Sequence, residues 1–194
     1  MAIEIERKFQ VLDDGWRSIA STGTALRQAY LIATKPRTLR LRLIDAQRAT
    51  LTAKFRRGHI TREEYEYAIP YSDALRMFEF ALGTVEKVRY QIQYADHLWQ
   101  VDVYFGANCG LIVAEIELRN WWDDPPHPKW LGPEITGNPL YSNRALAMRR
   151  RASAMTCPLS QASPPACPLS EPGRNEIRVR GTQKLRLLDN GDAV

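Results

Sequence analysis

Long hydrophobic runs are missing from this sequence of 194 residues. No stretch of about 18 consecutive apolar residues occurs, so the sequence offers no candidate for a membrane-spanning helix. A charged residue already stands at Glu4, which leaves no apolar signal segment at the start of the chain. We therefore expect residence in the cytoplasm.

Cysteine is also scarce. Cys109, Cys157 and Cys167 are odd in number and widely spaced, which matches neither a disulfide framework nor a zinc-binding pattern. Charge of both signs is abundant, with 27 Lys and Arg against 22 Asp and Glu and a net charge of +5. The basic excess suggests an anionic partner, such as nucleic acid, a nucleotide or polyphosphate.

The segment from Ile3 to Phe9 alternates apolar and charged residues. Read as a β-strand, it places Glu4, Glu6 and Lys8 on one face. Carboxylates two residues apart on a strand lie about 6.6 Å from each other and repel when sheltered from water. A hard cation such as Mg²⁺ or Mn²⁺ would relieve that repulsion. The alternative is the solvated outer face of an edge strand, where the pair costs little.

The same alternation recurs along the chain and predicts strands at residues 28–34, 38–44, 49–57, 62–69, 85–94, 98–105 and 111–119. Their short connections favour an antiparallel sheet. Apolar residues at helical spacing predict helices at 72–82 and 142–151, the second capped by Ser142. A short helix or turn is expected at 13–21, and an irregular loop, rich in Trp and Pro, at 120–137.

Charges on the polar strand faces are segregated by sign. The acidic positions are Glu4, Glu6, Glu64, Asp102, Glu115 and Glu117, and the basic positions are Lys8, Arg40, Arg42, Lys54, Lys87 and Arg89. An eight-stranded antiparallel sheet usually closes on itself, which removes its edges. Alternation defines two faces but does not say which one points inward.

Two amphipathic helices need an apolar surface to cover, and this favours a barrel with charges inside and helices outside. We expect an α+β, mainly β fold: a closed eight-stranded antiparallel barrel with helices packed on the outside. The reverse arrangement, a small barrel with charges outside and a packed or lipophilic interior, stays open at this point. In a charged interior, clustered Arg and Lys would bind phosphate oxygens, while Glu and Asp would hold hard cations. Inward acids count against a nucleic-acid groove, so we expect no nucleic-acid partner.

Residues in this order resemble the CYTH superfamily, the triphosphate tunnel metalloenzymes. The E-x-E-x-K signature stands as Glu4-Ile5-Glu6-Arg7-Lys8 and is weak alone. The series that follows it is specific: 28–31 (QAYL), 40–42 (RLR), Lys54, 62–66 (REEYE), 87–90 (KVRY), 101–103 (VDV), 114–118 (AEIEL), 132–136 (GPEIT) and 141–143 (YSN). The resemblance covers roughly residues 1–151 and implies an eight-stranded tunnel with a charged interior.

The resemblance also implies an activity: metal-dependent hydrolysis of the terminal phosphate of tripolyphosphate or a related small-molecule triphosphate. Mg²⁺ or Mn²⁺ would be bound by Glu4, Glu6, Asp102, Glu115 and Glu117. Lys8, Glu4 and Glu6 would be catalytic. The substrate would be held by Lys8, Arg40, Arg42, Lys54, Lys87, Arg89 and Glu64.

Other interpretations stay open. A class IV adenylate cyclase, making cyclic AMP and pyrophosphate from ATP, belongs to the same superfamily, and a polyphosphate- or RNA-binding module without activity is a third. Residues 152–194, rich in Pro and containing two of the cysteines, match nothing in the family, and we expect a flexible tail. No membrane partner is expected, and a homodimer is left open.

Overall fold

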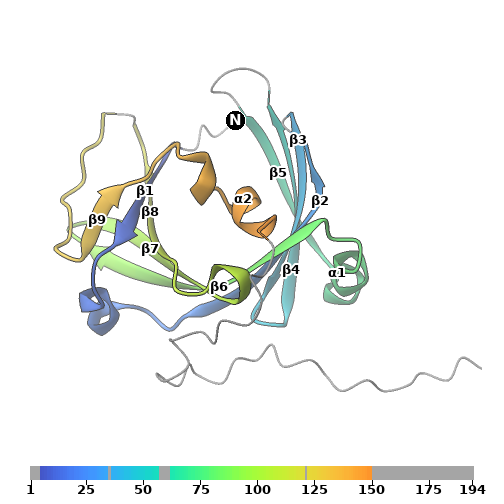
Figure 1. Cartoon of the computed structure of the whole chain (residues 1–194), viewed down its shortest axis with the longest axis horizontal. Helices are drawn as coiled ribbons and strands as arrows, with labels where there is room; N and C mark the ends of the chain where they lie inside the picture. Colours follow the sequence, from blue (N-terminus) through green and yellow to red (C-terminus); the bar gives the residue numbers. More distant parts are fainter. Residues whose placement is uncertain (1–4, 35, 57–61, 121, 150–194) are drawn as a thin grey trace, which may run out of the picture.

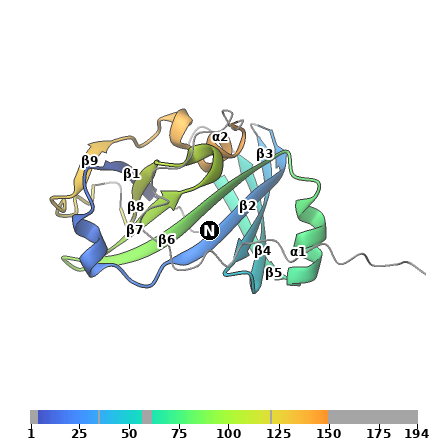
Figure 2. The ribbon, with the colours of Figure 1, turned by 60° about the horizontal axis from the view of Figure 1, so that its bottom comes forward.

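The computed structural model describes residues 5–34, 36–56, 62–120 and 122–149. Glu4 and the expected tail at 152–194 lie outside these residues, so the predictions made for them stay predictions. Figure 1 shows strands curving around a central space, and Figure 2 shows the same sheet from below.

One antiparallel sheet of nine strands makes up most of the fold. Its strands follow the order β5-β4-β3-β2-β6-β7-β8-β1-β9. They are β1 (Ile5–Val11), β2 (Thr24–Ala33), β3 (Arg37–Ile44), β4 (Arg48–Arg56), β5 (Arg62–Ile69), β6 (Gly83–Tyr94), β7 (His97–Tyr104), β8 (Ile112–Leu118) and β9 (Leu131–Glu134). The mainly β, antiparallel prediction is confirmed.

The predictions of eight strands and of a closed barrel are wrong. β9 forms inside the segment expected to be an irregular loop, and it pairs with β1 through Phe9 opposite Glu134 and Val11 opposite Leu131. Its four residues are too few to show alternation, and Pro133 is tolerated because β9 is an edge strand. β1 is bonded to β8 on one edge and to β9 on the other, so it has no edge left for β5. In the described ranges, no ladder joins the two ends of the sheet.

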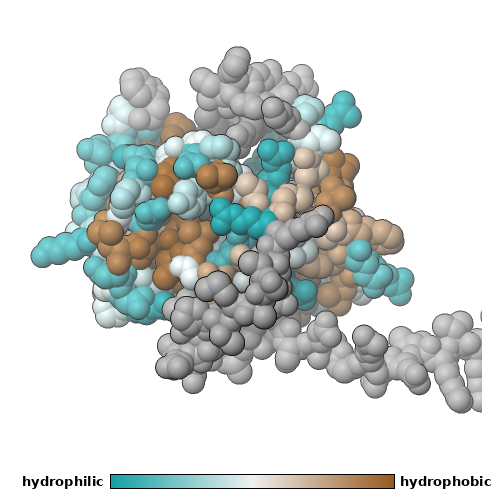
Figure 3. Space-filling model, viewed as in Figure 1, coloured by the Kyte–Doolittle hydropathy of each residue, from teal (hydrophilic) through white to brown (hydrophobic). Residues whose placement is uncertain are grey.

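Helix α1 (Tyr71–Phe78) covers the outer face of the sheet, as predicted. Its Ala74 is fully buried in a core with Ala29 of β2 and with Leu41 and Leu43, which alternate with the charged positions Arg40 and Arg42 of β3. Apolar atoms also gather on the surface of this flank in Figure 3, where Leu75, Phe80 and Leu82 are exposed.

Helix α2 (Asn143–Ala147) lies inside the curved sheet, which corrects the expectation that both helices cover the exterior (Figure 1). Leu146 and Ala147 pack against Tyr30, Val85 and Tyr104. Val85 and Lys87 alternate on the same face of β6, so the inner face carries apolar positions as well as charged ones, and these anchor α2. The Ser142 hydroxyl accepts a hydrogen bond from the Ala145 amide at 3.2 Å and caps the helix as predicted.

The outer face of the other half of the sheet holds the largest apolar core. Trp99, Ile116 and Phe9 lie there under Trp16 of the 3₁₀ helix η1 (Gly15–Ile19) and Trp130. Two further 3₁₀ turns, η2 (Gly106–Asn108) and η3 (Pro139–Tyr141), lead into β8 and α2. Within the part of the chain that the structure describes, no helix is long and apolar enough to cross a membrane.

Gly83 allows α2 to approach β6 closely. A Cβ atom at this position would lie 2.5 Å from the backbone oxygen of Ala147. We expect Gly83→Ala to push α2 off the sheet and to lower the free energy of unfolding by about 1–3 kcal/mol, the usual cost of overpacking. Urea denaturation measures this effect. The control is Thr84→Ala at the exposed neighbouring position, and equal stability of both variants would contradict the close approach.

Candidate active site

The inner face carries the charged residues, as the sequence predicted. Lys8 on β1 lies opposite Glu115 on β8, and its Nζ is 2.5 Å from Glu115 Oε1 and 2.8 Å from Glu6 Oε1. Only 5% of the Glu115 side chain is exposed. One ammonium group therefore joins two carboxylates that would otherwise repel each other.

Arg89 and Lys87 of β6 share the carboxylate of Asp102 on β7. The Arg89 guanidinium donates to both Asp102 oxygens, each at 2.7 Å, and its Nη2 also reaches Glu115 Oε2 at 2.6 Å. Lys87 Nζ donates to Asp102 Oδ2, and both side chains are fully buried. Glu115 thus links the β1 pair to the β6 cations, so these charges form a single network.

The network changes how its members titrate. Burial raises the pKa of Glu6, and Glu115 raises it further. Burial acts in the same direction on Glu115, but Lys87, Lys8 and Arg89 outweigh it and hold the pKa of Glu115 well below its ordinary value. Burial lowers the pKa of Lys8, yet Glu115 and Glu6 raise it above normal, so Lys8 stays protonated at neutral pH.

A second charged cluster lies on strands β3 to β5. Lys54 Nζ is 2.6 Å from Glu64 Oε2, and Arg40 Nη2 lies 3.7 Å from Glu64 and 3.6 Å from Glu66. The Thr52 hydroxyl accepts a hydrogen bond from Arg40 Nη2 at 3.2 Å and donates one to Glu66 Oε2 at 2.7 Å, so it connects the two side chains. Arg42 shares the inner face of β3 with Arg40 and lies opposite Gln28 of β2 and Thr50 of β4.

The expected metal ligands are only partly brought together. Glu6 and Glu115 meet at Lys8, whereas Asp102 is bound to Arg89 and Lys87. Glu117 lies opposite Glu6 in the ladder but is exposed. Among the described residues, no group of three or more His, Cys, Asp or Glu stands ready to hold a metal ion. The proposed ligand set therefore stays a prediction.

Several polar residues of the inner face were not in the predicted set. Glu66 and Thr52 join the second cluster, and Glu66 shows the same alternation as Glu64, which could have indicated it. Asn143 of α2 accepts from Tyr104 Oη at 3.0 Å and from Lys87 Nζ at 3.5 Å. Asn143 stands in the segment 141–143 of the family resemblance but was given no role, because its contacts depend on a helix entering the interior.

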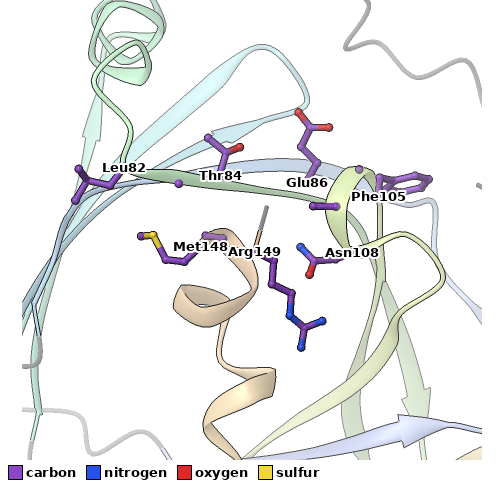
Figure 4. Close-up of a pocket in the computed structure, with 11 residues that line it drawn as sticks. Leu82, Thr84, Glu86, Phe105, Asn108, Met148 and Arg149 are labelled. Atoms are coloured by element: carbon purple, nitrogen blue, oxygen red, sulfur yellow. The ribbon is translucent and has the colours of Figure 1, made fainter. Parts of the chain in front are cut away.

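A cavity of about 480 Å³ opens where β6 begins, between η2 and the end of α2 (Figure 4). Leu82, Phe105, Met148 and Arg149 line it, and the side chains of Thr84 and Glu86 point away from α2. None of the predicted site residues lines this cavity. This cavity is therefore separate from the charged residues of the inner face.

Fold and site together are those of a curved, mainly β protein whose inner face carries paired cations and carboxylates. The model of the CYTH domain matches residues 2–143, and the chain belongs to the CYTH family. It is 38% identical over 148 residues to the inorganic triphosphatase of Acetivibrio thermocellus, covering 75% of this chain and 94% of that protein.

The inorganic triphosphatase of Nitrosomonas europaea is 32% identical over 153 residues, covering 75% of this chain and 97% of that protein. A crystal structure of an inorganic triphosphatase is also similar, with 32% identity and a TM-score of 0.59. The match covers 78% of this chain and 99% of the crystallised one.

Replacing Glu115 tests the buried network. Because its pKa is lowered on folding, Glu115 stabilises the protein above its unfolded-state pKa, near the ordinary value of 4.5, and this contribution is lost as pH falls below that. We expect Glu115→Gln to cost about 3 kcal/mol at pH 7 by leaving buried cations uncompensated. Its unfolding free energy should also fall less steeply than the wild type's as the solution is acidified.

Thermal and urea unfolding between pH 3 and pH 7 measure both effects. The matched control is Glu117→Gln on the same strand, where an exposed carboxylate should contribute little to stability. Equal acid sensitivity of wild type and Glu115→Gln would contradict the network.

Proposed function

We propose that this protein is a metal-dependent triphosphatase that removes the terminal phosphate of inorganic tripolyphosphate or a related triphosphate. The observation that carries the proposal is the inner face, where cations from β1, β3, β4 and β6 lie in two clusters of ion pairs. The names of the relatives support the same activity. A compact chain of phosphates matches this spacing of charges better than a single phosphate would.

Substrate binding would exchange partners within the two clusters. Phosphate oxygens replace carboxylates as acceptors for Lys8, Lys87 and Arg89 on one wall, and for Arg40, Arg42 and Lys54 on the other. Guanidinium groups suit this exchange, since their fork of donors fits two phosphate oxygens at once. Glu64 forms ion pairs with Lys54 and Arg40, and these contacts would keep the two cations oriented for the substrate.

The donor chemistry of the first cluster fits a hard cation. Glu6 and Glu115 of this cluster, and Glu117 opposite Glu6 in the ladder, offer carboxylate oxygens, the ligands that Mg²⁺ and Mn²⁺ prefer. We propose Glu4, Glu6, Asp102, Glu115 and Glu117 as ligands of Mg²⁺ or Mn²⁺. The bound ion would supply positive charge to phosphate oxygens.

Lys8, with Glu4 and Glu6, is proposed as catalytic. Since its pKa is raised, Lys8 acts as a fixed positive charge rather than as a general base. Its position between Glu6 and Glu115 places this charge beside the proposed metal ligands, where it can orient the attacking water or stabilise the leaving oxygen.

Product analysis separates the candidate functions. The purified protein is incubated with tripolyphosphate or ATP in Mg²⁺ or Mn²⁺, and again with excess EDTA. We expect orthophosphate and pyrophosphate from tripolyphosphate, and loss of turnover in EDTA that is restored by adding metal. Cyclic AMP with pyrophosphate from ATP would instead identify a cyclase. Tight binding without turnover would identify a binding module.

Glu117→Gln tests the proposed metal ligands. Removing one anionic ligand should lower turnover by about 10²-fold and raise the metal concentration needed for half-maximal activity. The control is Glu86→Gln on the opposite face of β6, where Glu86 pairs with Arg27 at 3.2 Å outside the charged interior. Unchanged turnover of Glu117→Gln at saturating metal would remove Glu117 from the ligand set.

A further inference from the structure

Three polar side chains stand side by side on the inner face without hydrogen-bond partners. Gln28 of β2 lies opposite Arg42 of β3, which in turn lies opposite Thr50 of β4. Directly opposed residues of an antiparallel ladder project from the same face. The buried atoms without partners are Gln28 Nε2 and Oε1, Arg42 Nε and Thr50 Oγ1. Because such atoms are nearly always paired in folded proteins, the row requires an explanation.

Arg42 differs from the cations around it. Arg40, Lys54 and Arg89 each contact a carboxylate, whereas Arg42 forms no ion pair with any residue that the structure describes. Burial lowers the pKa of Arg42, and the positive charge of Arg40 lowers it further. A half-buried cation that contacts no carboxylate is costly, and an anion binding at the inner face would lower that cost.

Gln28 is completely buried and so cannot meet a ligand from solution directly. Its ladder partner Val85 and its neighbour Tyr30 both pack against α2. The group within its reach that needs a partner is Arg42, directly across the ladder. An amide oxygen is a suitable acceptor for a guanidinium N–H, and a threonine hydroxyl is another.

We propose that Gln28 and Thr50 are positioning residues that hold the Arg42 side chain toward the bound phosphate chain. This inference rests on the proposed function, because it takes a polyphosphate as the anion. When the Nη groups of Arg42 donate hydrogen bonds to phosphate oxygens, its remaining N–H groups donate to Gln28 Oε1 and Thr50 Oγ1. Polar groups without partners in the ligand-free protein gain hydrogen bonds in the complex, and the free energy of these hydrogen bonds favours binding.

A double-mutant cycle tests the inference. Tripolyphosphate binding is measured by calorimetry in EDTA, for wild type, Gln28→Met, Thr50→Val, Arg42→Met and the double variants. Each single change at Gln28 or Thr50 should weaken binding about 10-fold, as expected for one hydrogen bond to a charged group. In the Arg42→Met background, neither change should weaken it further. Arg42→Lys, which lacks the guanidinium fork, replaces Arg42→Met if that variant does not fold.

The melting temperature of the empty protein separates positioning from a structural role. Gln28→Met and Thr50→Val remove unpaired groups, so we expect an unchanged or higher melting temperature. Thr52→Val is the matched control, because the Thr52 hydroxyl already bonds Arg40 and Glu66 and its loss should lower the melting temperature. A lower melting temperature of Gln28→Met with unchanged tripolyphosphate affinity would overturn the proposal. It would also be overturned if Gln28→Met weakened tripolyphosphate binding as much in the Arg42→Met background as in the wild type.

The design also separates this inference from the proposed function. If the wild-type protein binds tripolyphosphate in EDTA, shows the expected cycle and yet releases no orthophosphate with metal, the triphosphatase proposal fails and the positioning role stands. If the wild-type protein does not bind tripolyphosphate in EDTA, the positioning role is overturned, whatever the activity with metal.

Discussion

Mutual neutralisation of buried charges is the constraint on which this structure depends. Asp102 and Glu115 are almost wholly enclosed, and each contacts two cations. Asp102 contacts Lys87 and Arg89 of β6, whereas Glu115 contacts Lys8 of β1 and Arg89 of β6. Isolated charges at such depth would be prohibitively costly, whereas shared ones are tolerated because every oxygen has a donor. The antiparallel ladder makes the sharing feasible, since it places Lys8 directly opposite Glu115 and Arg89 directly opposite Asp102.

Much of the fold could be predicted because alternation is a local property. Charged and apolar residues alternate on most of the strands, and on β3 the apolar face is the one that α1 covers. Two features could not be predicted. β9 is too short for a periodic signal, and α2 lies on the inner face because Tyr30, Val85 and Tyr104 form an apolar patch there. That patch arises only once β2, β6 and β7 are assembled.

The same difference between local and assembled information holds for the candidate site. Charged residues such as Arg40, Lys87 and Glu115 were found because their type and alternation stand out in the sequence. Gln28 has no such signal, since a lone glutamine in a strand is unremarkable until its amide is seen to be buried without a partner. The register of the strands decides which carboxylates lie close together and which pair with arginine. The spacing of these residues in the sequence does not show that register.

The open seam of the sheet has a mechanical consequence. In a fully closed barrel, the strand number and the shear together fix the diameter, and a wider barrel requires hydrogen bonds between strands to break. Here the described strands end at β5 on one side and β9 on the other. The described ladders therefore do not fix the distance between the two ends of the sheet. For the proposed triphosphatase, the width of the interior is then set by the bound molecule and not by a closed ring of backbone hydrogen bonds.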